Sequence, residues 1–229
     1  MLAPASPEAP PSSAAACPGL LSPQQPFGSI TLPLLHSGSL RLTPEQFAEL
    51  CQANPDAVLE LAADGSLICM TPTGGDTGAR NAALAFQIQA WARANGSWKA
   101  FDSSTGFRLP DDSVLSPDAS LVALDRWQGL SADQRRGFAP LCPDLVVELA
   151  SPSDEGPRGL TALRQKMAAY QRNGARLGWL LIPAERAVEI WEPLADSPAE
   201  PRRLEAASRL DGDPHFPGLA VDLDEIWAG

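Results

Sequence analysis

The chain has 229 residues, of which 44% are hydrophobic and 20% charged, and its formal net charge is −11. A chain of this length can bury one sizeable core, and the composition is ordinary for a globular protein. The acidic balance argues against a broad, non-specific nucleic-acid binder, because such proteins carry an extended basic surface. The sequence contains neither a long apolar span nor a basic segment ahead of an apolar run. We therefore expect a cytoplasmic protein without membrane contact.

The cysteines and histidines do not form a recognisable site. The four cysteines make no Cys-x-x-Cys pair, and neither His36 nor His215 lies at ligand spacing from any of them. This pattern favours neither a zinc site nor a disulfide framework. If the protein is an enzyme, carboxylates and Lys or Arg must therefore carry its chemistry.

The chain divides into a Pro/Ala/Ser-rich segment, residues 1–40, and a patterned remainder, residues 41–229. We expect the first to be a flexible extension, with residues 30–32 adding a short edge strand, and the second to form a single domain. A helix over residues 43–52 opens the domain, because its start combines an N-cap threonine, a first-turn proline and a capping box.

The remaining elements follow from hydrophobic periodicity and turn residues. Asp64-Gly65 between two apolar runs predicts a hairpin. In chain order we expect strands over 58–61 and 66–70, a helix over 77–95, strands over 98–102, 106–109 and 115–124, a capped helical turn over 131–138, a strand over 145–150, a helix over 159–172, strands over 177–182 and 187–192, a loop-like segment over 193–210, and a docking apolar segment over 219–227. This order predicts an α/β (mixed α+β) fold with a mixed sheet flanked by helices.

Two expected strands carry a carboxylate among apolar residues. Residues 145–150 form the most apolar strand, so we expect it to be central, and Glu148 in its interior is costly to bury unless it is paired or bound to a metal. Asp118, in Ser-Pro-Asp, interrupts a second strand. Glu148 alone could be a salt-bridged structural residue, whereas the two together form a plausible oxygen-ligand pair for Mg²⁺ or Mn²⁺. Glu60 is a third candidate, which could equally be an exposed residue of its hairpin strand.

Lys166 is the candidate cation. Leu160, Leu163, Met167 and Tyr170 form the apolar stripe of the helix over 159–172, and Lys166 lies on the flank of that stripe. From there the side chain could extend into solvent, or it could reach over the sheet toward Glu148. In the second case its ammonium group would stabilise charge that develops on a phosphate or would orient an attacking water.

Eight groups of residues together resemble a known family. They are Leu59-Glu60 with Asp64-Gly65; Met70-Thr71-Pro72-Thr73-Gly74-Gly75; Phe101-Asp102-Ser103-Ser104 with Phe107-Arg108-Leu109-Pro110; Ser116-Pro117-Asp118; Cys142-Pro143-Asp144 through Glu148 to Ser151-Pro152-Ser153-Asp154; Lys166-Met167 with Tyr170; Asn173-Gly174; and Gly178-Trp179-Leu180. Their ordered combination resembles the Uma-type restriction endonucleases of the PD-(D/E)XK nuclease superfamily, from about residue 42 to residue 227.

The resemblance implies a restriction endonuclease-like fold and a Mg²⁺- or Mn²⁺-dependent endonuclease that hydrolyses DNA. It makes Asp118 and Glu148 the two acidic residues of the motif, in preference to Asp144, and Glu60 a helper ligand. The superfamily's lysine normally lies two residues after the glutamate, where this chain has Ala150. The resemblance implies that Lys166 takes its place.

Our hypothesis is that Asp118 and Glu148, with Glu60 and the backbone carbonyl of Leu149, hold the metal, while Lys166 positions or helps to deprotonate the attacking water. A homodimer is expected by analogy with enzymes that cut two strands. Two alternatives stay open. One is a non-catalytic interaction protein with a nuclease-like fold, and the other is a glycosidase that uses Asp118 and Glu148 as its acid and nucleophile.

Overall fold

The computed structural model describes residues 41–70, 72–154, 157–193 and 200–228. The predicted extension over residues 1–40, with its short strand over 30–32, lies outside these ranges. None of the helices in the described ranges combines the length and the apolar character that a membrane crossing requires.

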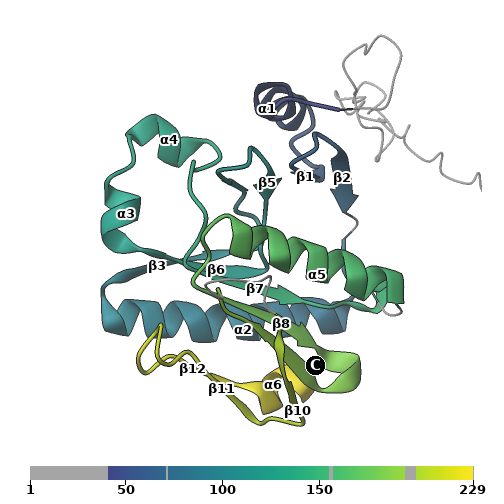
Figure 1. Ribbon diagram of the computed structural model, residues 1–229, viewed down its shortest axis with the longest axis vertical. Helices are drawn as coiled ribbons and strands as arrows, with labels where there is room; N and C mark the ends of the chain where they lie inside the picture. The colour runs from purple at the N-terminus through teal and green to yellow at the C-terminus, as the bar shows by residue number, and fades with distance from the viewer. Residues whose placement is uncertain (1–40, 71, 155–156, 194–199, 229) are drawn as a thin grey trace, which may run out of the picture.

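A six-stranded mixed sheet forms the centre of the molecule (Figure 1). Its strand order is β10 (Arg202–Glu205), β9 (Ala187–Trp191), β8 (Leu177–Ile182), β7 (Leu145–Leu149), β6 (Ala119–Ala123) and β3 (Trp98–Asp102). Strands β7 and β8 are parallel, and the other neighbours are antiparallel. The predicted fold class, a mixed sheet flanked by helices, is confirmed.

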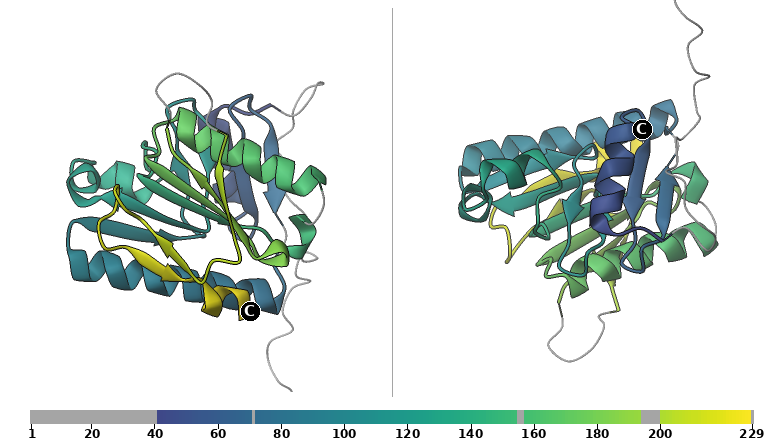
Figure 2. Two further views of the ribbon diagram at one scale, coloured as in Figure 1. Left: turned by 60° about the horizontal axis from the view of Figure 1, so that its bottom comes forward. Right: turned by 90° about the horizontal axis from the view of Figure 1, so that it is seen from above.

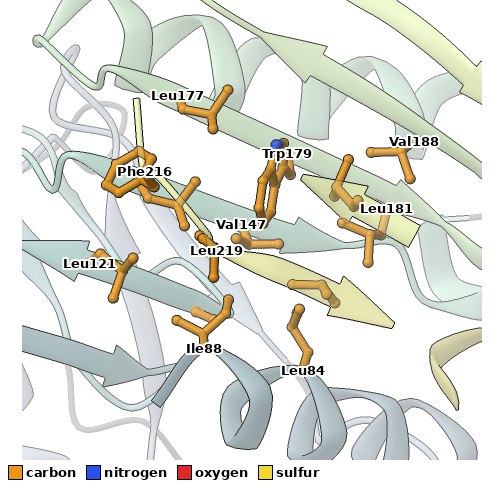
Figure 3. Close-up of a cluster of buried hydrophobic side chains, with 14 of the residues drawn as sticks. Leu84, Ile88, Leu121, Val147, Leu177, Trp179, Leu181, Val188, Phe216 and Leu219 are labelled. Atoms are coloured by element: carbon orange, nitrogen blue, oxygen red, sulfur yellow. The ribbon is translucent and has the colours of Figure 1, made fainter. Parts of the chain in front are cut away.

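Two helices cover opposite faces of this sheet. In Figure 1, α2 (Gly75–Asn95) lies below the strands and α5 (Pro157–Arg172) lies above them. Figure 3 shows the α2 side, where Leu84 and Ile88 face Val147 and Trp179 of the central strands. All five residues of β7 are buried, as expected of a central strand covered on both sides.

A second, four-stranded sheet stands beside the first. Its order is β2 (Leu67–Met70), β1 (Val58–Leu61), β5 (Val114–Leu115) and β4 (Phe107–Arg108). The helix α1 (Pro44–Ala53) packs on it around a small core that includes Phe47, Leu50 and Leu61. In the right-hand view of Figure 2, α1 and the β1–β2 hairpin lie in front of the large sheet.

The predicted helix and hairpin signals in this region are confirmed. Thr43 and Gln46 form the capping box of α1. Gly65 supplies the positive φ, 82°, that the β1–β2 turn requires. Gly96 ends α2 in the left-handed conformation, as expected. The helix begins at Gly75, two residues earlier than predicted. Further along, Ser131 and Gln134 form the capping box of α4 (Ala132–Arg136).

The strand predicted over 115–124 is two strands in different sheets, so this prediction was wrong. Strand β5 ends at Leu115, β6 begins at Ala119, and α3 (Leu124–Gln128) already begins at Leu124. The break lies at Ser116-Pro117-Asp118. Pro117 has no N–H to donate to a ladder, and the N–H of Ser116 donates to Glu60 Oε1 instead. The chain therefore changes sheets at this point.

The segment over 193–210, predicted to be loop-like, contains strands β10 and β11 (Arg209–Asp211). Residues 194–199 lie outside the described part. Strand β10 is mostly exposed and charged, so it lacks the alternation of apolar and polar residues that marks a strand. It is a strand because it pairs with the buried β9.

The apolar end of the chain docks as expected, because β12 (Ala220–Asp222) pairs with β11 and α6 (Leu223–Ala228) buries Leu223 and Ile226. Short 3₁₀ turns η1 (Pro152–Asp154) and η2 (Pro183–Glu185) complete the fold.

Candidate active site

Lys166 of α5 reaches the large sheet at Glu148. The Lys166 Nζ lies 2.9 Å from Glu148 Oε1, and the two side chains are only 13% and 4% exposed. Strand alternation places Glu148 on the α5 side of β7, with Val146. Of the two positions left open for Lys166, the lysine therefore takes the one over the sheet.

Glu60 joins the same ion pair from the small sheet. Its Oε1 lies 2.8 Å from Lys166 Nζ and accepts a hydrogen bond from the backbone N–H of Ser116 at 2.7 Å. Lys166 also donates to the backbone oxygen of Ser116 at 3.1 Å. Glu60 is 2% exposed, so it is not the exposed hairpin residue that its sequence position also allowed.

Asp118 lies in the segment between the two sheets. Its Oδ2 accepts a hydrogen bond from the backbone N–H of Leu149 at 2.8 Å, which places it beside the end of β7 that carries Glu148. Its Oδ1 accepts a hydrogen bond from Asn81 Nδ2 at 3.2 Å. Asp144, the other Pro-Asp, precedes β7 and forms an ion pair with Arg126 at 2.8 Å. Asp144 therefore belongs to the opposite end of that strand.

Tyr170 is a further buried partner of Glu148. It lies one helical turn after Lys166, and its hydroxyl donates to Glu148 Oε1 at 3.1 Å. The sequence placed Tyr170 on the apolar stripe but gave no sign of this hydrogen bond. Asn81 was not a candidate at all, because nothing near it in the sequence marks a polar residue of α2 as a partner of Asp118.

Burial and repulsion between carboxylates shift the pKa values of Glu148 and Asp118 upward. Burial raises the pKa of Glu148 to about 8, with Asp118 and Glu60 adding to the rise and Lys166 opposing it. Burial also raises the pKa of Asp118, against the hydrogen bond from Leu149. For Lys166, burial alone would lower the pKa, but Glu148 and Glu60 outweigh it and hold the pKa above its ordinary value. The ammonium group therefore stays charged at neutral pH.

When all three carboxyl groups are ionised, they face one ammonium group and leave the site with excess negative charge, which a divalent cation would balance. Within the described ranges, no three Asp, Glu, His or Cys side chains converge closely enough to hold a metal ion by themselves. Two carboxylates suffice for Mg²⁺, which keeps several of its waters in protein sites. Asp118 and Glu148 lie at the same end of β7, so they are the pair that could hold such an ion. Lys166 contacts both Glu148 and Glu60.

Two residues near the cluster, Ala150 and Arg164, have partners outside it. Ala150, at the usual lysine position, carries no functional group, and its backbone N–H donates to Leu181. Arg164, whose side chain is 40% exposed, pairs with Glu189, which is only 3% exposed. A buried carboxylate of β9 requires a cationic partner, and the far flank of α5 supplies one.

The comparison with family models matches residues 44–224 to Uma2, described as "Putative restriction endonuclease". This match spans most of the chain. The chain belongs to the Uma2 family. The resemblance drawn from the sequence motifs is thereby confirmed.

A solved structure has the same fold as this Uma2 protein. It is described as "a putative nuclease belonging to DUF820" from Anabaena variabilis, with a TM-score of 0.65 and 18% sequence identity. The alignment covers 82% of this chain and 98% of that one. A comparison with curated proteins found no match. The family and the fold together support a nuclease with a restriction endonuclease-like core.

Proposed function

We propose that this Uma2 protein is a cytoplasmic, metal-dependent endonuclease that hydrolyses phosphodiester bonds of DNA. The observation that carries the proposal is the position of Lys166 Nζ, 2.8 Å from Glu60 and 2.9 Å from Glu148. The motif lysine is missing at Ala150, just after β7, and an ammonium group reaches the glutamate from α5 instead. A buried lysine beside two carboxylates, with a third close by, is a combination that supports metal-dependent phosphodiester hydrolysis.

Asp118 and Glu148 would hold the metal, with the backbone oxygen of Leu149 as a further ligand. A bound Mg²⁺ or Mn²⁺ would supply Lewis acidity and lower the pKa of a coordinated water. The chain's own part is to fix these carboxylates. The Leu149 N–H holds Asp118, and the Tyr170 hydroxyl holds Glu148.

Lys166 would act as a fixed positive charge. Because its pKa lies above the ordinary value, it donates hydrogen bonds and is a poor base. Its ammonium group would orient the attacking water and offset the negative charge that grows on the phosphate. Glu60 would hold Lys166 in place through the 2.8 Å ion pair, in addition to its proposed role as a helper ligand.

The test is cleavage of single- and double-stranded DNA with Mn²⁺ or Mg²⁺. The variants Asp118→Ala, Glu148→Ala and Lys166→Ala are each expected to lose at least about 100-fold in rate, since each removes a group that acts on the transition state. Lys99→Ala is the matched control, because Lys99 and Lys166 are the only two lysines of the chain and Lys99 is exposed on β3. Its rate should equal that of the parent protein.

A parental rate in Glu148→Ala would contradict the assignment. If the parent cleaves no DNA and shows no thermal response to Mn²⁺, the chain is a nuclease-fold protein without catalysis. A homodimer would provide one site for each DNA strand, and cross-linking of the active protein checks this part of the proposal.

A further inference from the structure

Asn81 lies on the face of α2 that packs against the sheet. The buried residues of this face are Thr77, Leu84, Ile88 and Ala92. Asn81 follows Thr77 by four positions and precedes Leu84 by three. Residues with this spacing share one side of a helix. The amide is therefore directed toward the sheet by the same packing that orients the core residues of α2.

The amide of Asn81 completes the hydrogen bonding of Asp118. Asn81 Nδ2 donates to Asp118 Oδ1 at 3.2 Å, and the Leu149 N–H donates to Asp118 Oδ2 at 2.8 Å. The carboxylate is thus held from two sides, by α2 and by β7. Hydrogen bonds of this kind orient a ligating carboxylate and tune its affinity for a metal.

The other end of the same amide is unsatisfied. Within the described part of the chain, Asn81 Oδ1 is buried and has no hydrogen-bond partner. A buried acceptor without a donor is unfavourable, and native proteins satisfy such atoms with water or an ion. Next to Asp118, a hydrated cation would offer the missing donor through one of its waters.

We infer that Asn81 is a positioning residue of the divalent-ion site, whose N–H fixes Asp118 and whose carbonyl oxygen accepts from the ion's water shell. This inference rests on the proposed function. Asn81 acts through Asp118 and through water, so it is not itself a catalytic residue. It adds α2 to the elements that build the site, beside β1, β7 and α5.

Calorimetric titration of the metal-free protein with Mn²⁺ tests the inference without any measurement of activity. Asn81→Ala is expected to weaken the affinity about 10-fold or more. Its metal-free melting temperature should stay near that of the parent, because the change removes an unsatisfied acceptor together with one hydrogen bond. Gln89→Ala, at an exposed position of the same helix, is the control and should bind Mn²⁺ as the parent does.

Asn81→Asp separates positioning from a merely structural role. It places a second carboxylate beside Asp118, so the metal-free melting temperature should fall and the rise on adding Mn²⁺ should exceed that of the parent. Parental Mn²⁺ affinity in Asn81→Ala, whatever its melting temperature, would overturn the inference. If affinity is lost in Asp118→Ala at the same time, the proposed nuclease site still stands. A parent that binds no Mn²⁺ would overturn both.

Discussion

Lys166 is the residue on which the charge balance of the site depends. A buried charge is stable only with partners that repay its loss of hydration. Lys166 has two carboxylate partners and a backbone oxygen, whereas Glu148 shares this single cation with Glu60. The acidic side of the cluster is therefore under-compensated, and its carboxylates are the groups whose ionisation depends on what else is bound.

The shifted pKa of Glu148 predicts how metal-free stability depends on pH. Burial raises this pKa from its usual 4.5 to about 8, so between these values the folded state binds more protons than the unfolded state. The free energy of unfolding should therefore fall as the pH rises through this window. Asp118, whose pKa is also raised, acts in the same direction. Urea unfolding in the presence of a chelator, at several values between about pH 6 and pH 8.5, measures the slope.

Glu148→Gln is the matched variant for this measurement. It keeps an oxygen acceptor for Tyr170 but does not titrate, so its stability should change less with pH over the same range. Carboxylates with lowered pKa values, such as Asp64 and Asp111, affect stability only at more acidic pH and do not confuse the comparison. Equal slopes in the parent and in Glu148→Gln would show that Glu148 is not the titrating group.

The sequence was informative about this cluster where local pattern and chemistry coincide. The apolar character of the strand over 145–150 predicted that Glu148 is buried. The apolar stripe of the helix over 159–172 left two directions for the Lys166 side chain, into solvent or over the sheet. It could not choose between those directions, because the choice depends on how α5 lies across β7. Asn81 lies 37 residues before Asp118, and only the tertiary fold brings the two together.

At the scale of the elements, the packing of α5 on β8 positions the part of the helix that carries Lys166. A Cβ on Gly178 would lie 2.5 Å from Met167 Cε, and 3.3 Å from Trp191 Cβ. Met167, the residue after Lys166, is fully buried at this contact. The absence of a side chain at Gly178 therefore leaves room for the Met167 side chain where α5 packs on the sheet, one residue after Lys166.

The substitution Gly178→Ala tests this packing of α5 on β8. The added methyl group must displace Met167 Cε, the end of a flexible side chain, which should cost about 1 kcal/mol of stability. Because Lys166 is the neighbouring residue, cleavage should fall by up to roughly 10-fold. Gly78→Ala in α2 is the control, because its Cβ would meet nothing within 4 Å. That control should be neutral or slightly stabilising, since alanine is the better helix former. Chemical denaturation and the cleavage assay check both variants. An unchanged free energy of unfolding and an unchanged cleavage rate in Gly178→Ala would contradict the close packing of Met167 on Gly178.

Elements with strong local signals could be predicted, and those that depend on their partners could not. The capping boxes at Thr43 and Ser131 mark the starts of α1 and α4 without reference to the rest of the fold. The division of β5 from β6 depends on a hydrogen bond between Ser116 and Glu60, which are 56 positions apart. Strand β10 depends on the free edge of β9. In both cases the decisive partner is distant in the sequence.

At the scale of the whole molecule, the site lies where two sheets and two helices meet. Glu60 comes from the small sheet, Glu148 from the large one, Lys166 from α5, and Asp118 from the segment that connects the sheets. Ion pairs and hydrogen bonds between these groups are also contacts between the elements. A ligand that relieves repulsion among the carboxylates would therefore stabilise the fold as a whole and not only its own position.

This coupling predicts that Mn²⁺ raises the melting temperature of the parent protein. A ligand at 100 times its dissociation constant stabilises a fold by about 2.7 kcal/mol if the unfolded chain does not bind it. Differential scanning calorimetry with Mn²⁺, compared with a chelator, measures the shift. The net charge of −11 requires a control, because any salt screens the self-repulsion of such a chain. NaCl of equal ionic strength should therefore produce a smaller shift, and Glu148→Ala should respond to Mn²⁺ and NaCl alike. If the parent also responds to the two salts alike, screening explains its stabilisation and the acidic cluster binds no ion.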